Sequence, residues 1–71
     1  MNHTFNISKD GMNNVAVTIN TKNKTVSDID VIINEYLTFE LDIKEYKCIG
    51  KHDVGENLST YVYEFKNENT D

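Results

Sequence analysis

The spacing of apolar residues changes twice along this chain, and these changes limit the folds open to it. In the first 20 residues, apolar side chains alternate with polar ones, as in half-buried strands. Between residues 26 and 37 the spacing becomes three or four, which is typical of an amphipathic helix. Alternation returns between residues 46 and 65. This order predicts a small α+β domain, ββαββ, with an antiparallel sheet and one helix packed on one face.

The length of the turn in the first strand pair follows from its parity, because an even or an odd number of turn residues decides which face of the sheet each apolar side chain occupies. A two-residue turn at Asp10-Gly11 would put the apolar residues of the two strands on opposite faces of the sheet. A three-residue loop over residues 9–11, with Gly11 left-handed, instead pairs Phe5 with Val15 and keeps one apolar face. We therefore predict the three-residue loop.

The second strand pair favours a shorter turn. Gly55-Glu56 suits a two-residue type II′ turn, because glycine comes first. Counting back from this turn pairs Cys48 with Tyr63 and Ile49 with Val62. The second pair would form an apolar island on an otherwise polar face, and we predict that it serves as an oligomer interface.

Two overlapping signals mark the start of the helix. Thr25 precedes Asp28 by three residues, and Ser27 precedes Asp30 by the same spacing, so either pair could form a capping box. The predicted inner face consists of Val26, Ile29, Ile32, Ile33, Tyr36 and Leu37. No glycine marks the helix end, which we place near residues 38–39. Residues 39–43 fit either one more helical turn or an extended segment.

The size of the chain leaves room for only a small core. Its 71 residues predict one domain spanning residues 1–71, with frayed ends at 1–2 and 67–71. A single cysteine, Cys48, excludes an internal disulfide, and no Cys/His cluster indicates a structural metal. We expect Cys48 to act as a small buried hydrophobe. Self-association would add the burial that the missing cross-links do not supply.

Negative charge is concentrated in the middle of the chain. The net charge is −5 and there is no arginine, which argues against direct binding to nucleic acid or to an anionic membrane. Six acidic residues lie between residues 28 and 45, where Lys44 is the one base. The predicted partner-binding residues are Asp28, Glu35, Glu40, Asp42 and Glu45. The first two, seven positions apart, share one side of the helix.

No residue pattern predicts catalysis. Cys48 and His52 come nearest to a nucleophile and base, but four strand residues span about 13 Å, whereas a working pair needs roughly 3 Å. No glycine-rich loop accompanies the carboxylates, and a domain this small seldom encloses a substrate pocket. We therefore expect no catalytic residue, no metal site and no cofactor.

Composition indicates an origin and a compartment. Asn, Lys and Ile are frequent, as in low-GC bacterial or phage genes. The N-terminus lacks the basic and apolar regions of a signal peptide, and no apolar run is long enough for a membrane helix. A lone thiol without an export signal favours the reducing cytoplasm.

Together these features predict a small, acidic, non-enzymatic protein-binding module of the inhibitor or regulator type that phages or mobile elements encode. Its acidic surface would dock on a basic, nucleic-acid-handling partner protein, because clustered carboxylates can take the place of phosphates. The alternative is a homo-oligomeric structural or accessory protein that uses its open sheet face and strand edges. A homodimer through Ile49 and Val62 is compatible with either function.

Overall fold

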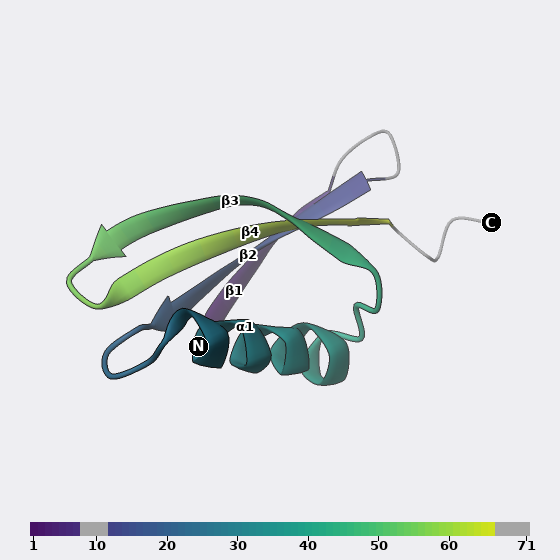
Figure 1. Ribbon diagram of the computed structural model, residues 1–71. Coiled ribbons are helices and arrows are strands. Elements are labelled where there is room, and N and C mark those ends of the chain that lie inside the picture. The colour runs from purple at the N-terminus through teal and green to yellow at the C-terminus, as the bar shows by residue number, and fades with distance from the viewer. Residues whose placement is uncertain (8–11, 67–71) are drawn as a thin grey trace.

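The computed structural model, which describes residues 1–7 and 12–66, consists of one four-stranded antiparallel sheet and a helix against one of its faces (Figure 1). The strands are β1 (Asn2–Ile7), β2 (Met12–Asn20), β3 (Tyr46–Gly55) and β4 (Leu58–Lys66), in the order β1-β2-β4-β3. Helix α1 (Val26–Glu35) connects β2 to β3, and β4 lies between these two strands. The predicted ββαββ fold of the α+β class is therefore confirmed.

The register of the first strand pair agrees with the parity argument. Phe5 lies opposite Val15, and His3 lies opposite Val17. Burial alternates along β2, so every second side chain of this central strand faces the core. The three-residue loop itself lies outside the described residues, and its turn type stays a prediction.

The turn of the second strand pair differs from the predicted one. Gly55 pairs with Leu58, so the two turn residues are Glu56 and Asn57. Asn57 has a φ of 58°, in the left-handed region that asparagine tolerates better than most residues. The glycine therefore ends β3 and is not the first residue of the turn.

A β-bulge also changes the pairing of β3. The register shifts between Cys48 and Gly50, so Gly50 and not Ile49 lies opposite Val62. The predicted Ile49–Val62 pair is wrong, whereas the predicted pairing of Cys48 with Tyr63 beyond the bulge is confirmed. A bulge adds a residue to one strand only, and counting back from the turn cannot detect it.

The helix starts at the first of its two possible caps. The backbone amide of Asp28 donates to Oγ1 of Thr25 (3.1 Å), and the amide of Thr25 donates to Oδ2 of Asp28 (3.0 Å). Val26, which we predicted on the inner face, is 74% exposed. Val26 is the first residue of α1, and the buried residues of the helix, Ile29 and Ile33, lie further along it.

The helix ends in a π-helical turn, η1 (Tyr36–Glu40), so the start of segment 39–43 is helical and not extended. Asp42 follows with a φ of 55° and reverses the chain. The amide of Ile43 then donates to the carbonyl oxygen of Leu37 (2.8 Å). An aspartate in the left-handed conformation thus ends the helix where a glycine is usual.

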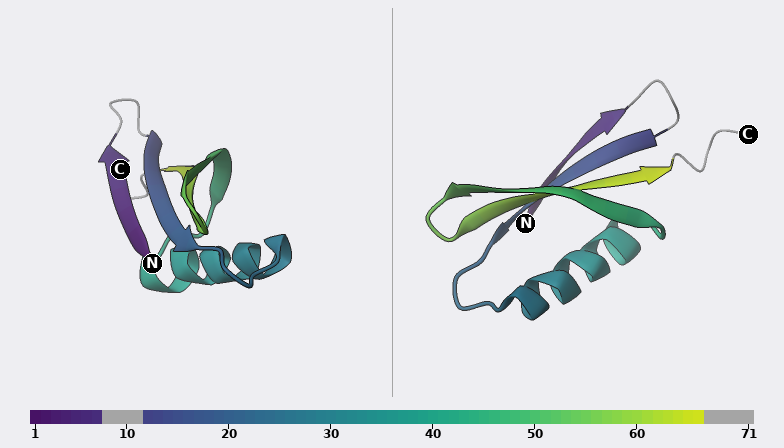
Figure 2. Two further views of the ribbon diagram at one scale, coloured as in Figure 1. Left: turned by 90° about the vertical axis from the view of Figure 1, so that its left-hand side faces the viewer. Right: turned by 45° about the horizontal axis from the view of Figure 1, so that its top comes forward.

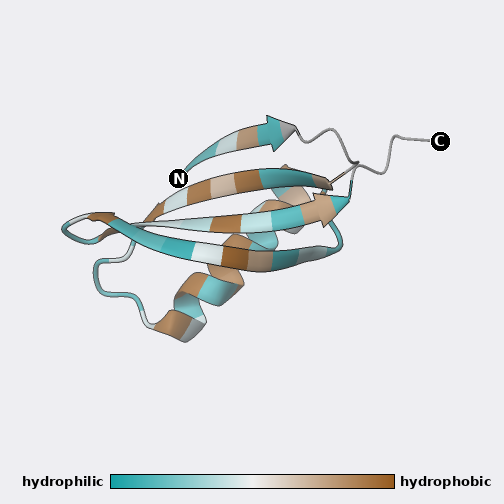
Figure 3. Cartoon of the chain, turned by 90° about the horizontal axis from the view of Figure 1, so that it is seen from above, coloured by the Kyte–Doolittle hydropathy of each residue, from teal (hydrophilic) through white to brown (hydrophobic). Residues whose placement is uncertain are grey.

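The core lies between α1 and the inner face of the sheet (Figure 2). Its buried members are Val15, Val17, Ile19, Ile29, Ile33, Leu37, Ile43, Tyr61 and Tyr63. Polar contacts also join the helical segment to both edge strands. The Tyr36 hydroxyl lies 2.5 Å from Nδ1 of His3 on β1, and the hydroxyl of Tyr46 on β3 donates to Oδ1 of Asn34. Figure 3 views the sheet from the side away from α1, so the helix lies beneath the strands. Within residues 1–7 and 12–66, nothing covers this outer face of the sheet.

Candidate interaction surfaces

The five predicted partner-binding acids are all exposed, but the structure distributes them over several places. Asp28 is part of the capping box at the start of α1. Glu35 ends α1 and Glu40 ends η1, whereas Asp42 forms the turn that follows and Glu45 directly precedes β3. The five acids therefore belong to different elements of the fold.

One side of the helical segment carries alternating acidic and apolar residues. Asp28, Val31, Glu35 and Phe39 follow one another at spacings of three or four, which places them on the same side of the helix. The π-helical turn brings Glu40, five residues after Glu35, to that side as well. We call these five residues the acidic flank. Val31 is 54% exposed and Phe39 is 79% exposed. Both glutamates lie with Phe39 around a shallow hollow of about 220 Å³. Neither glutamate carboxylate has a hydrogen-bond or ion-pair partner among the residues that the structure describes.

Phe39 is the feature that the sequence analysis did not single out. It has the highest exposure of the large hydrophobic residues described. Its position could not be assigned while segment 39–43 was either helical or extended. The signal that would have found it is the spacing of four residues from Val31 to Glu35 and again from Glu35 to Phe39.

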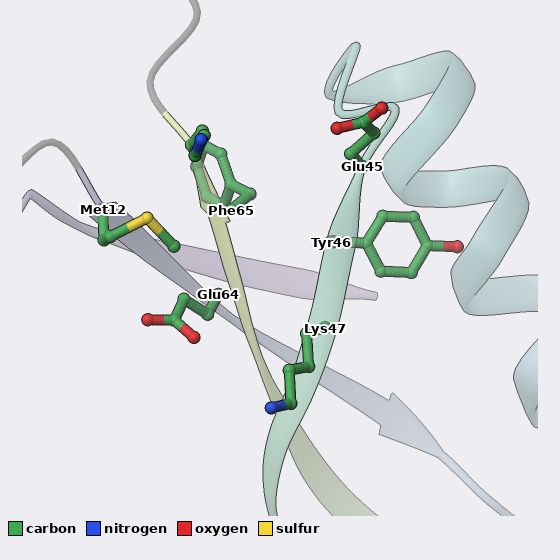
Figure 4. Close-up of a pocket in the computed structure, with 7 residues that line it drawn as sticks. Met12, Glu45, Tyr46, Lys47, Glu64 and Phe65 are labelled. Atoms are coloured by element: carbon green, nitrogen blue, oxygen red, sulfur yellow. The ribbon is translucent and has the colours of Figure 1, made fainter.

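Glu45 belongs to a different hollow. This hollow, of about 410 Å³, lies between the start of β3 and the end of β4 (Figure 4). Its lining includes Lys47 and Lys66 as well as Glu45 and Glu64, so positive charge offsets negative charge there. Glu45 therefore does not extend the acidic flank.

The outer face of the sheet presents small residues at its centre. The strand register places Thr4, Ala16, Val62 and Gly50 in one row across the four strands. Ile49, at the bulge next to this row, is 49% exposed, whereas Val62 is only partly exposed. The two predicted interface residues thus lie on neighbouring strands, Ile49 on the edge strand β3 and Val62 on the inner strand β4, without being a cross-strand pair.

Cys48 is exposed, so its predicted burial is wrong. Its thiol donates to the carbonyl oxygen of Gly50, with an S···O distance of 3.6 Å. Cys48 pairs with Tyr63 on the inner face, whereas His52 pairs with Thr60 beyond the bulge and lies on the outer face. Over residues 1–7 and 12–66, no group of three or more His, Cys, Asp or Glu residues is arranged to hold a metal ion.

Two buried or half-buried phenols carry perturbed pKa values. Burial raises the pKa of Tyr63 well above its ordinary value, and the charges of Cys48 and Asp30 raise it further. Burial also raises the pKa of Tyr46. The Tyr63 phenol therefore stays protonated in the folded protein at alkaline pH.

We expect the free energy of unfolding to fall above about pH 10, where an unfolded tyrosine loses its proton. A folded pKa above the unfolded one gives stability that is complete below the unfolded pKa and is lost as the pH rises toward the folded pKa. One such phenol produces a slope of about 1.4 kcal/mol per pH unit. Urea unfolding from pH 8 to 11.5 measures it. The free energy of unfolding of Tyr63→Phe should fall less steeply with pH, because this variant has no phenol at position 63. If the free energies of the parent and of Tyr63→Phe fall in parallel above pH 10, the raised pKa of Tyr63 is contradicted.

Comparison with known proteins finds no family model, no curated protein and no solved structure that matches this chain. In the part of the chain that the structure describes, no helix has both the length and the apolar character needed to cross a lipid bilayer. The function must therefore be inferred from the surfaces.

Proposed function

We propose that the protein is a small acidic binding module that docks the acidic flank on a basic surface of a nucleic-acid-handling protein. It would act as an inhibitor or regulator of the kind that phages or mobile elements encode, in the cytoplasm and without catalysis. The observation that carries this proposal is the 79% exposure of Phe39 between two glutamates that have no partner among the described residues.

An exposed aromatic side chain gains most when a partner covers it. Protein interfaces concentrate their binding energy in a few central anchors, often aromatic, surrounded by polar or charged residues. Phe39 has the properties of such an anchor, and Glu35 and Glu40 lie beside it. The flank therefore supports a compact, mixed apolar and electrostatic contact.

The charge of the helical segment sets the kind of partner. From Val26 to Glu40 the chain contains four acidic residues and no basic one. The negative electrostatic field of these residues attracts a basic protein surface over a distance of about one Debye length. The same field repels the phosphates of a nucleic acid. A protein groove that normally holds a nucleic-acid backbone offers the matching charge.

Phe39→Ser is expected to weaken partner binding at least about tenfold, because interface anchors contribute roughly 2 kcal/mol or more. The matched control is Val26→Ser, since Val26 is also largely exposed but lies at the other end of the helix. The partner would be captured from a low-GC bacterial lysate and identified by mass spectrometry, and calorimetry would then give the dissociation constants. Equal affinities for the parent and Phe39→Ser would overturn the proposal.

The second candidate is a homo-oligomeric structural or accessory protein, and the uncovered outer face of the sheet favours it. The central row consists of small side chains, which allow two copies to approach closely, and Ile49 lies beside it. The edge of β3 is less suited to pairing, because its register shifts twice, between Cys48 and Gly50 and between Asp53 and Gly55, and because it carries two lysines, Lys47 and Lys51.

If this candidate is right, the protein is a dimer at micromolar concentration, and Ile49→Lys weakens the dimer without unfolding the monomer. The side chain is half exposed, so a lysine can be accommodated in the monomer. Sedimentation equilibrium measures the association, and circular dichroism checks the fold. A parent protein that stays monomeric at high concentration would exclude this second candidate.

A further inference from the structure

A hollow of about 310 Å³ lies between α1 and the strands β3 and β4, away from the acidic flank. It is lined by Asp30, Ile33, Asn34, Tyr46, Cys48, Tyr61 and Tyr63. Asp30 and Asn34 are four residues apart and share a side of the helix that differs from the side of Asp28 and Glu35. Its volume is at the lower end of the roughly 300–1,000 Å³ that small-molecule sites occupy.

Three tyrosines are among the residues that line this hollow. The rings of Tyr46 and Tyr63 are nearly perpendicular, with an angle of 89° and a centroid distance of 5.5 Å. Tyr61 follows from the same face of β4, two residues before Tyr63. The hydroxyl of Tyr46 donates to Asn34, and Tyr63 is 7% exposed, so packing and hydrogen bonding hold these side chains in place.

The electrostatics of the hollow favour a cation. The faces of aromatic rings carry partial negative charge. Asp30 is the one carboxylate among the lining residues, and no lysine lines the hollow. The Tyr61 ring already attracts an ammonium group within the chain, because Nζ of Lys51 lies 5.7 Å from its centroid.

We propose that the hollow binds an organic ammonium group of the methylated kind that choline and a trimethyllysine side chain share. Methyl groups make the ammonium larger and less strongly hydrated, so it gives up less hydration when it enters an aromatic site. Asp30 supplies the countercharge at the rim, and the perpendicular rings contact the methyl groups. This site is independent of the acidic flank, and either proposal can fail alone.

The test uses choline, its neutral isostere 3,3-dimethylbutan-1-ol, and two short peptides that carry lysine or trimethyllysine. Chemical shifts of the tyrosine ring protons follow binding, and protection of the exposed Cys48 thiol from a bulky reagent gives a second readout. We expect saturable binding of choline or of the trimethyllysine peptide, with a dissociation constant on the order of 1 mM. The isostere and the unmodified peptide should bind about tenfold more weakly or worse.

Two variants of Tyr46 separate the ring from its hydroxyl. Tyr46→Phe and Tyr46→Leu both remove the hydroxyl, but only Tyr46→Leu removes the aromatic ring. We expect Tyr46→Phe to keep most of the affinity and Tyr46→Leu to lower it about tenfold. Asp30→Asn should lower the affinity about threefold. Glu56→Gln removes an exposed charge at the distant β3–β4 turn and should leave the affinity unchanged.

The results test whether the ammonium site exists, and they also show whether its ligand is a free small molecule or a modified protein. Binding of choline alone indicates a free small molecule, and binding of the trimethyllysine peptide alone indicates a modified protein. Either result supports the ammonium site. Equal binding of choline and its isostere, unchanged affinity of folded Tyr46→Leu, or no saturable shift at about 50 mM ligand would overturn it, because the hollow would then lack recognition of the charge.

Discussion

Ile33→Ala is expected to lower the free energy of unfolding by about 2–5 kcal/mol. Ile33 is 1% exposed and lies on the side of α1 that packs against the sheet. Truncation removes buried methyl and methylene groups and leaves a cavity that neighbouring side chains fill only in part. Small domains are stable by only about 5–15 kcal/mol, so this loss is a large share of the total.

Two controls in the same helix make this measurement specific. Val26→Ala also truncates a β-branched residue, but Val26 is 74% exposed, so we expect a change within about 0.5 kcal/mol. Asp28→Ala removes half of the capping box and should cost about 1 kcal/mol. Urea unfolding midpoints give all three values. Equal losses for Ile33→Ala and Val26→Ala would contradict the burial of this side of the helix.

Charge reversal on the acidic flank is expected to slow association with the partner. Glu35→Lys and Glu40→Lys should each lower the association rate about tenfold at low salt, because each replaces an attraction by a repulsion. Glu56→Lys makes the same change in net charge at the β3–β4 turn and should have a much smaller effect. All three side chains are exposed, so the fold should survive.

The rates would be measured by stopped flow from about 50 to 500 mM salt. The difference between parent and flank variants should shrink as salt rises, since screening shortens the range of the attraction. Asp42 is less suited to reversal, because its φ of 55° favours aspartate, asparagine or glycine, and Asp42→Asn is the better neutral variant there. Association rates that do not depend on salt would contradict electrostatic docking, as would equal rates for the flank variants and Glu56→Lys. The acidic residues would then serve only to keep the protein soluble.

Local sequence rules predicted the elements well where each rule depends on neighbouring residues. The parity of the strand pairing predicted the β1–β2 register. The spacing of Thr25 and Asp28 was one of two possible capping signals, and it is the one that the structure uses. The strand order was not predictable, because pairing within a hairpin does not determine which strands of two hairpins meet. The position of β4 beside β2 depends on how the helix and the two hairpins pack together.

The candidate surface was predictable in composition but not in arrangement. The predicted acids are all exposed, but the π-helical turn η1 determines which of them share a surface. This turn places Phe39 and Glu40 beside Glu35, and the reversal at Asp42 leads Glu45 toward the lysines of another hollow. The bulge at Ile49 had no signal in the sequence, because a bulge depends on the fit of a whole strand to its neighbour.

The choice between docking and self-association depends on which surface a partner covers. Backbone amide chemical shifts of the labelled protein, recorded while the captured partner is added, measure this surface directly. We expect the changes to concentrate at Val31, Glu35, Phe39 and Glu40, on the acidic flank. Changes that concentrate instead at Ala16, Thr18, Thr60 and Val62, on the outer face of the sheet, would contradict this expectation.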